Sequence, residues 1–490
     1  MCQVHNRGTA VVQNGGGAGW SSSLRLVILS EAKDLLFGGS TRAFGYLGIG
    51  EHCGKSAGRP AAPATIPKDR LKGTGRPGSG VWDMLARHYE LLEQHLALNV
   101  EQQKEREAAE DFRKQLQEKS LGGHAQPSAA ELLRWLDENP ELLAQIARVS
   151  WGSARGSGLT PAQFKEELEA VPLPSPHDEP FTHSIVHMLS QQIEDACREL
   201  GIPLLSGVAY GSSSALDVSA AQYGVPLTDA SVISLSTGFI TFCSSISRML
   251  SLSLPHEADG DRLKVTFNPG LVLAKIESNT DLRNYWEKVI GDYAFGSGPL
   301  SGGHHAVPFP ASFTRMQLLF SMERFSLAHE YGHHVGQHGK RVAIGVGSDA
   351  DAFGHEFEAD LFALSLERYI GMRDARPNIF SASGAAAAVL LKCHDCIRRV
   401  RQILRTGEDA IQSDGTHPET PDRIAAFEQL DHQLPDSQRE HLIEMRNSCV
   451  AIVDEMYRKL KPVYTAMHKR GARRPDPTSH YEFDPPRCLL

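Results

Sequence analysis

The residues with the clearest chemical potential are His329, Glu330 and His333, which form the pattern H-E-x-x-H at the end of an apolar run, 316–328. Residues four apart share one face of a helix, so the two imidazoles can aim at a single point. Tetrahedral zinc needs this from its first two protein ligands. Glu330 projects beside them, where a carboxylate can hold a metal-activated water and take its proton. The pattern therefore indicates a hydrolytic zinc site.

A third ligand is expected from the segment that follows. Ser348 and Asp351 suit a capping box for a helix that begins there, and Gly371 suits its end. On that helix Glu356 and Asp360 are four residues apart and share a face. Glu356 would complete a set of two histidines and one carboxylate, leaving the fourth zinc position for water. Asp360 would accept a hydrogen bond from a ligand imidazole and fix its tautomer.

Other polar residues near the motif compete for these roles. Glu358 faces another side of the expected helix and becomes the ligand only if the register shifts; His355 also points away. The longer pattern H-E-x-x-H-x-x-G-x-x-H fails, because Gly339 occupies its last position and His338 comes one residue early. This argues against a metzincin. We expect His334 and His338 to be solvated or hydrogen-bonded neighbours.

Gly332, inside the motif, predicts how the metal helix is packed. Glycine in a helix interior costs about 1 kcal/mol relative to alanine. A chain that keeps one there usually needs another backbone or a packed side chain close by. The apolar residues of 316–328 do not keep to one face, which is typical of a buried helix. We expect a central metal helix with the site at the bottom of a cleft.

The combined motifs resemble a known class of enzymes. His329-Glu330-x-x-His333 followed by Glu356-x-x-x-Asp360 resembles the gluzincin-type zinc metallopeptidases. The short spacing between the H-E-x-x-H motif and Glu356, and the sequence pattern E-x-E-A-D-x-F-A, resemble the ImmA/IrrE-like peptidases. The segment T-H-P-E-T-P-D-R-I-A-A-F resembles an element of the M48 (CAAX-prenyl-protease/HtpX-like) peptidases that lies near their active site. The resemblance covers roughly residues 205–430 and does not decide between the two families.

The M48-like segment adds two candidate site residues. His417 could stabilise the oxyanion of a tetrahedral intermediate or occupy the open zinc position as a plug. A surface loop histidine is the alternative. Arg423 could pair with a carboxylate near the site and pin the loop, or it could be a solvated helix arginine.

The resemblance implies a zinc-dependent endopeptidase with one Zn²⁺ per chain and a protein or peptide substrate. Glu330 would act as general base and later return the proton to the leaving amine. The segment 231–236 is similar to the edge strand of these peptidases and would pair with an extended substrate. Two alternatives remain open. One is a regulatory peptidase specific for one partner, such as a repressor or antitoxin, and the other is a zinc-stabilised interaction module without turnover.

Composition limits the partners and the location. The formal net charge of −9 gives no general attraction to nucleic acid, so we expect no nucleic-acid partner. No apolar run approaches the roughly 18 residues of a membrane span, and no signal peptide is visible. We therefore expect a cytoplasmic protein. Eight cysteines in 490 residues are not a disulfide scaffold. The pattern does not predict the oligomeric state.

The chain divides into four expected regions. Residues 1–80 show no sustained periodicity and are predicted to be a disordered or non-native leader. Residues 81–170 read as a helical appendage. A zinc metallopeptidase domain is expected at 171–470, followed by a flexible tail at 471–490.

Within the third region we expect an α+β, zincin-like fold that is mainly helical with a small sheet over the metal helix. The strand candidates are 208–240, 263–267 and 271–276. A helix over 179–200 carries His183 and His187, which are also four residues apart. Because no carboxylate partner is evident, we interpret them as a packing or surface pair.

Overall fold

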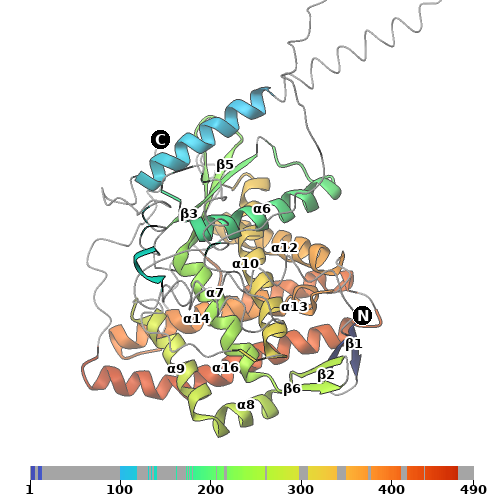
Figure 1. The fold of residues 1–490 in the computed structure, drawn as a ribbon, viewed down its shortest axis with the longest axis vertical. Coiled ribbons are helices and arrows are strands. Elements are labelled where there is room, and N and C mark those ends of the chain that lie inside the picture. Colours follow the sequence, from blue (N-terminus) through green and yellow to red (C-terminus); the bar gives the residue numbers. More distant parts are fainter. Residues whose placement is uncertain are drawn as a thin grey trace, which may run out of the picture.

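In the computed structural model the chain has an α+β architecture, mostly helical with two small sheets (Figure 1). The described residues are 2–5, 9–13, 100–118, 180–205, 207–213, 218–259, 262–296, 307–308, 310–338, 349–373, 377–409, 417–434 and 436–472, with scattered positions between 131 and 178. None of the helices in these ranges combines the length and apolar character that crossing a membrane requires.

A helix spans 100–118; the labelled elements consist of two strands before it and a longer series that begins at residue 180. In chain order they are β1 (Cys2–His5), β2 (Thr9–Gln13), α6 (Pro180–Glu199), β3 (Val208–Ser213), β4 (Ala220–Gly224), β5 (Ser231–Ser236), α7 (Thr237–Ser253), β6 (His256–Asp259), β7 (Arg262–Thr266), α8 (Pro269–Ser278), α9 (Thr280–Ala294), α10 (Ala311–Val335), α12 (Asp349–Arg373), α13 (Ile379–Ser383), α14 (Ala385–Thr406), α15 (Thr420–Ala426), the 3₁₀ helix η2 (Phe427–Gln433) and α16 (Arg439–Lys469).

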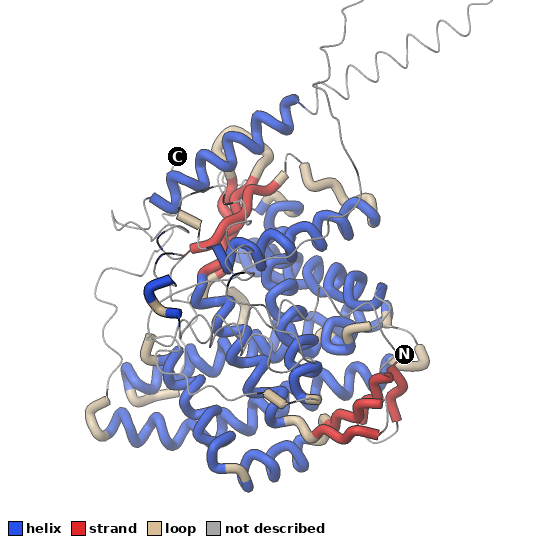
Figure 2. The backbone as a smooth tube through the Cα atoms, in the orientation of Figure 1, coloured by secondary structure: helices blue, strands red, loops and turns tan. Residues whose placement is uncertain are grey.

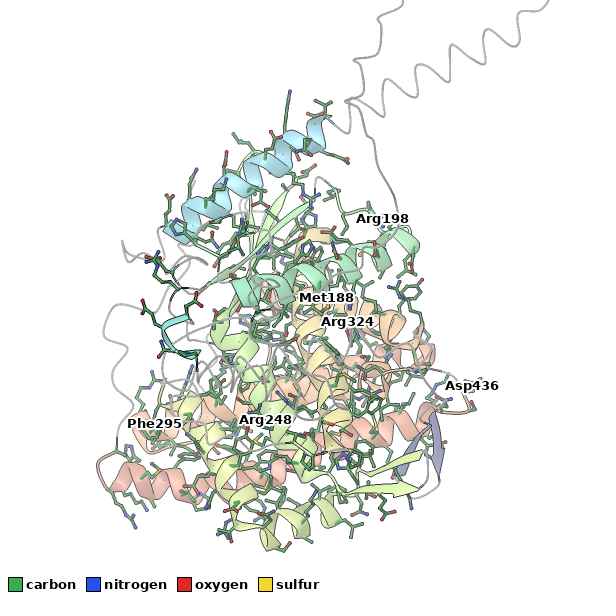
Figure 3. All side chains as sticks on the ribbon, in the orientation of Figure 1. Met188, Arg198, Arg248, Phe295, Arg324 and Asp436 are labelled. Atoms are coloured by element: carbon green, nitrogen blue, oxygen red, sulfur yellow. The ribbon has the colours of Figure 1, made fainter. Side chains whose placement is uncertain are left out.

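Helix α10 is the centre of the fold. Most of its residues are buried, and it contacts α6, α7, α12, α13 and α14. Residues on every side of the helix contribute to the main hydrophobic core, as the apolar run predicted. Arg324, labelled in Figure 3, donates two hydrogen bonds from within this core to Glu367 of α12, at 2.6 and 2.9 Å. A buried ion pair therefore joins α10 to α12 in addition to the apolar packing.

The three-stranded sheet has the order β3-β5-β4, with β5 parallel to β3 and antiparallel to β4. We expected 231–236 to be an edge strand, and this was wrong: β5 is the central strand, and both its neighbours lie within the described part of the chain. The β-branched and apolar residues among the serines of Ser231–Ser236 favour a strand but carry no information about its neighbours. The edge strand that contacts α10 is β4.

The second sheet has the order β1-β2-β7-β6 and lies apart from the first (Figure 2). Strands β1 and β2 belong to the segment 1–80, for which we expected no regular structure; β2 pairs with β7 in antiparallel register. The rest of 1–80, where a disordered or non-native leader was predicted, lies outside the described residues. The edge of β7 offers backbone N–H and C=O groups with which β2 pairs. Local periodicity in 1–80 cannot reveal such a distant partner.

The segment 271–276 was predicted as a strand and instead lies in α8. Asn268 caps this helix by accepting a hydrogen bond from the Leu271 N–H at 3.2 Å, and Pro269 occupies its first turn. Proline there is pre-organised for a helix and its missing donor is not needed. This start signal outweighs the apolar run that follows. The predicted strand at 263–267 is confirmed as β7.

The helix at 100–118 packs directly against the three-stranded sheet (Figure 1). Ala109 shares a small apolar cluster with Ala209 of β3 and Val232 of β5. Arg113 also donates to both carboxylate oxygens of Asp178 at 2.7 Å. The described part of the expected appendage is therefore joined to the main body. At the other end of the chain, α16 packs on α14. Of the predicted tail, 471–490, the structure describes only the first two residues.

Candidate metal centre

The site is built where α10 crosses α12 at unusually short distance. A Cβ atom placed on Gly332 would lie 2.8 Å from the Cα of Ala359, so only glycine fits at the crossing. This confirms the expected reason for glycine inside the motif. His329 and His333 flank Gly332 on one helix, and Glu356 and Asp360 flank Ala359 on the other. The crossing therefore brings two pairs of polar side chains face to face.

Three of these side chains present ligand atoms to a common point. The Nε2 atoms of His329 and His333 are 3.0 Å apart, and they lie 3.4 and 3.3 Å from the Oε2 and Oε1 atoms of Glu356, respectively. Ligands held about 2.0–2.1 Å from a tetrahedral zinc are themselves about 3.3 Å apart. Among the described residues, this is the one group of three or more His, Cys, Asp or Glu with such proximity.

The carboxylate of Glu356 supports the same reading. Its Oε2 atom is buried and has no hydrogen-bond partner. The nearest cationic groups, on His329, His417 and Arg423, are 3.4, 3.6 and 3.7 Å away, which is beyond good hydrogen-bond length. A buried anionic oxygen without a donor is costly. A cation bound between the two imidazoles and this oxygen would satisfy it.

Asp360 lies behind the first histidine. Its Oδ1 atom is 3.0 Å from Nδ1 of His329, and Arg423 donates two hydrogen bonds to the carboxylate at 2.6 and 2.7 Å. Burial alone would raise the pKa of Asp360, but Arg423 and His329 outweigh it and lower that pKa. Asp360 is thus an ionised acceptor that can keep a proton on Nδ1 of His329, leaving Nε2 free as a ligand.

The electrostatic balance of the cluster favours positive charge. Burial disfavours the charged form of His329, yet the neighbouring carboxylates of Asp360 and Glu356 raise its pKa to about 10. For Glu356, burial is likewise outweighed by His329 and His333, and its pKa falls far below the usual range. Two carboxylates therefore hold a proton on an imidazole that would otherwise be neutral. A divalent cation would neutralise the negative charge of the two carboxylates more completely than one proton does.

Glu330 and His417 complete the surroundings. Glu330 is buried on α10 directly after His329. Burial would lower the pKa of Arg423, but the charges of Asp360 and Glu356, with a smaller contribution from Glu330, raise it. His417 precedes α15 and is half-exposed, with Nε2 3.6 Å from Oε2 of Glu356. Every residue to which the sequence assigned a site role, namely His329, Glu330, His333, Glu356, Asp360, His417 and Arg423, therefore lies at or beside this crossing.

The competing residues on α12 turn elsewhere, as expected. Glu358 contacts His338 at 3.0 Å, and the ring of His355 stacks on that of His338 with centroids 4.2 Å apart. The register of α12 is therefore the one that turns Glu356 towards the two histidines. Helix α12 continues to Arg373, beyond the expected stop at Gly371, where the close approach of Ser381 leaves no room for a Cβ atom.

His334 and His338 are hydrogen-bonded, as one of the two expectations for them had it, but the sequence did not predict their partners. Nδ1 of His338 lies 2.9 Å from Nδ1 of His333, the second ligand. His334 is fully buried, with Nδ1 2.8 Å from Oγ of Ser231 and Nε2 2.9 Å from the carbonyl oxygen of Leu204. The sequence signal for His338 was its near fit to a third-histidine motif; nothing local pointed to Ser231.

Comparison with known proteins provides no assignment. No model of a protein family matches the chain, and neither curated proteins nor solved structures show a significant similarity to it. The functional interpretation therefore depends on the arrangement of these residues alone.

Proposed function

We propose that the protein is a zinc-dependent endopeptidase with a gluzincin-type site in a zincin-like fold. The proposal depends on the convergence of His329, His333 and Glu356 at separations that suit one divalent ion, and on the buried Glu330 that follows His329 in the same helix. Zinc held by the three ligands would supply a Lewis acid that lowers the pKa of a water molecule towards neutrality and polarises a substrate carbonyl.

Glu330 is the group to which we assign proton transfer. It is buried on α10 and directly follows His329, so the helix that carries the two histidines also carries this carboxylate. In this role it takes a proton from the attacking water and delivers it to the leaving amine. A purely structural zinc site is closed by four protein ligands and needs no base. The set of three ligands plus Glu330 is what favours an enzyme over an interaction module.

The remaining residues would position the machinery. Asp360 holds His329, and Arg423 neutralises Asp360 while fixing α15 against α12. His417 stands on the exposed side of Glu356, from which an imidazole N–H could donate to the developing oxyanion. The resemblance of the sequence to the ImmA/IrrE-like and M48 peptidases implies that Glu356, Asp360, His417 and Arg423 act together at one site.

The substrate we propose is an extended peptide. Strand β4 contacts α10, and no strand in the described ranges pairs with its outer edge. Such an edge can bind a peptide backbone by strand addition. This role passes to β4 because β5, for which it was expected, is enclosed between β3 and β4.

The decisive experiment is Glu330→Gln. The variant should bind one zinc per chain, as the wild type does, because the ligands are intact, and it should lose hydrolysis because the base is gone. Zinc content by elemental analysis and cleavage of a proteome-derived peptide library measure the two properties. Asp195→Asn, an exposed carboxylate on α6, is the matched control and should change neither.

The outcomes separate the alternatives. A Glu330→Gln enzyme that cleaves peptides at the wild-type rate would contradict the mechanism. A wild type that binds zinc but cleaves nothing would favour the interaction module. Cleavage confined to one protein added from the native host, with none in the library, would identify the regulatory peptidase.

A further inference from the structure

The second ligand histidine has an unusual neighbour. Metal-bound histidines generally donate their other ring N–H to a carboxylate, a backbone carbonyl or water. Nδ1 of His329 faces the carboxylate of Asp360, 3.0 Å from its Oδ1 atom, whereas Nδ1 of His333 faces another imidazole, that of His338, at 2.9 Å. His338 in turn places Nε2 3.0 Å from Oε2 of Glu358. A chain of Glu358, His338 and His333 therefore leads to the candidate metal position.

The chemistry of these groups fixes the direction of each hydrogen bond. An ionised carboxylate only accepts, so Nε2 of His338 carries the hydrogen and donates it to Glu358. The neutral ring then has a bare Nδ1, which can only accept. Nδ1 of His333 must therefore be the donor, and its Nε2 is left with a lone pair. That Nε2 is the atom aimed at His329 and Glu356, as a metal ligand requires.

The backbone is built to turn His338 back towards α10. The helix ends at Val335, and Gln337 has a φ of 54°, in the left-handed region that non-glycine residues seldom occupy. A Cβ atom on Gly336 would overlap Nε2 of His338, so the ring can occupy this position only because residue 336 is glycine. His355 closes the other side of the ring by stacking with an interplanar angle of 10°. A strained turn that presents one buried side chain usually has a functional reason.

We propose that His338 is a positioning residue of the metal centre, which fixes the tautomer and orientation of His333 with Glu358 as its anchor. This inference rests on the proposed function, because it requires His333 to be a ligand. It assigns the acceptor role to Nδ1 of His338 and a purely steric role to His355.

Two substitutions at His338 separate hydrogen bonding from packing. His338→Phe keeps a ring against His355 but removes the acceptor, and should weaken zinc binding by about 10- to 100-fold. His338→Asn can place an oxygen near the position of Nδ1 and should keep zinc affinity close to that of the wild type. His355→Phe preserves the stack and is the matched control with no expected loss. Competition with a chromophoric chelator measures the affinities, and the visible spectrum of the cobalt-substituted proteins reports ligand geometry.

The results distinguish this inference from the function on which it depends. If the wild type has no affinity for zinc, the proposed metal site itself is wrong. Wild-type affinity in His338→Phe would overturn the positioning role and leave the site intact. If the variants do not fold, the imidazole ¹⁵N shifts of the zinc-loaded wild type decide. A hydrogen on Nε2 and a bare Nδ1 at His338 are expected, and the opposite tautomer would overturn the proposal.

Discussion

Helices α10 and α6 both carry two histidines four residues apart, yet they form different structures. On α10 the rings of His329 and His333 meet edge to face, with centroids 4.7 Å apart and Nε2 atoms converging on Glu356. On α6 the rings of His183 and His187 lie nearly parallel with centroids 6.4 Å apart. Nδ1 of His187 is taken by the hydroxyl of Tyr210 at 2.6 Å. Equal spacing thus leads to a pair that could hold a metal ion in one helix and to a packing pair in the other.

The difference lies in the carboxylates. Glu356 and Asp360 approach His329 directly, and they raise its pKa to about 10. The carboxylate nearest His183 belongs to Asp178, 3.7 Å away, but Asp178 is already bound by Arg113 and Gln117. Burial therefore dominates at His183 and lowers its pKa to about 4. A helix can align two imidazoles by itself, but a second element must supply the negative charge that makes them a cation site.

The largest contrast is expected from deleting one histidine of each pair. His333→Ala leaves one imidazole and one carboxylate, so the protein should lose stoichiometric zinc binding. His187→Ala should retain one zinc per chain. Elemental analysis after dialysis measures both. Zinc loss in His187→Ala, or retention in His333→Ala, would mean that the wrong pair has been assigned to the metal.

Neutralising the two buried aspartates should give the next largest effect. Asp360→Asn removes the anionic partner of His329 and should weaken zinc binding by about 10- to 100-fold. Asp178→Asn leaves the buried Arg113 with a weaker partner and should cost about 3 kcal/mol of unfolding free energy without changing zinc affinity. Chelator competition and denaturant unfolding separate the two effects. Equal zinc affinities in the two variants would argue against a specific role for Asp360.

Two glycines test whether close packing serves the metal. Gly332→Ala pushes against the backbone of α12 and should cost about 1–3 kcal/mol of stability, with a measurable loss of zinc affinity. At Gly211 in β3, a Cβ atom would lie 2.5 Å from Nη1 of Arg113. Gly211→Ala should therefore destabilise the protein but leave zinc binding unchanged. Thermal melts and zinc titrations on both variants show whether helix separation alone disturbs the site.

The smallest predicted effect concerns pH. The folded pKa of His183 is about 4, below the ordinary value of 6.5, because burial penalises its charged form. The unfolded chain then binds more protons between these values, so His183 favours folding above pH 6.5 and the benefit is lost as pH falls towards 4. Asp178, Arg113 and His187 are the charged or titratable groups that act on it. His183→Phe should reduce the loss of stability between pH 7 and pH 5 by at most about 2 kcal/mol. Denaturant unfolding at the two pH values measures this, and an unchanged slope would contradict the assignment.

Local periodicity was sufficient to predict the parts of the site that lie within single helices. The four-residue spacings of His329 with His333 and of Glu356 with Asp360 already place each pair on one face, and Gly332 indicated where the helices touch. The position of β5 could not be predicted, because strand order depends on contacts between distant segments. The apolar run at 271–276 suits a strand, but it lies in a helix. The helix-start signal of Asn268 and Pro269 outweighed the apolar pattern.

The contact between His338 and His333 marks another limit of the sequence. It depends on a left-handed backbone at Gln337, a residue type that gives no such signal, unlike glycine or asparagine. The same holds for His334, whose partners Ser231 and Leu204 come from segments more than a hundred positions away. Residues that orient a ligand through tertiary contacts are thus harder to find than the ligands themselves.

Because the candidate ligands come from two helices that cross at Gly332, a bound ion would cross-link α10 to α12. An ion that binds only the folded chain adds to its stability by mass action, about 4 kcal/mol when its free concentration is a thousand times the dissociation constant. Stripping the ion would then loosen the middle of the molecule, as reduction loosens a disulfide-bonded protein. The supply of metal in the surroundings would set how long the protein survives as well as how fast it works.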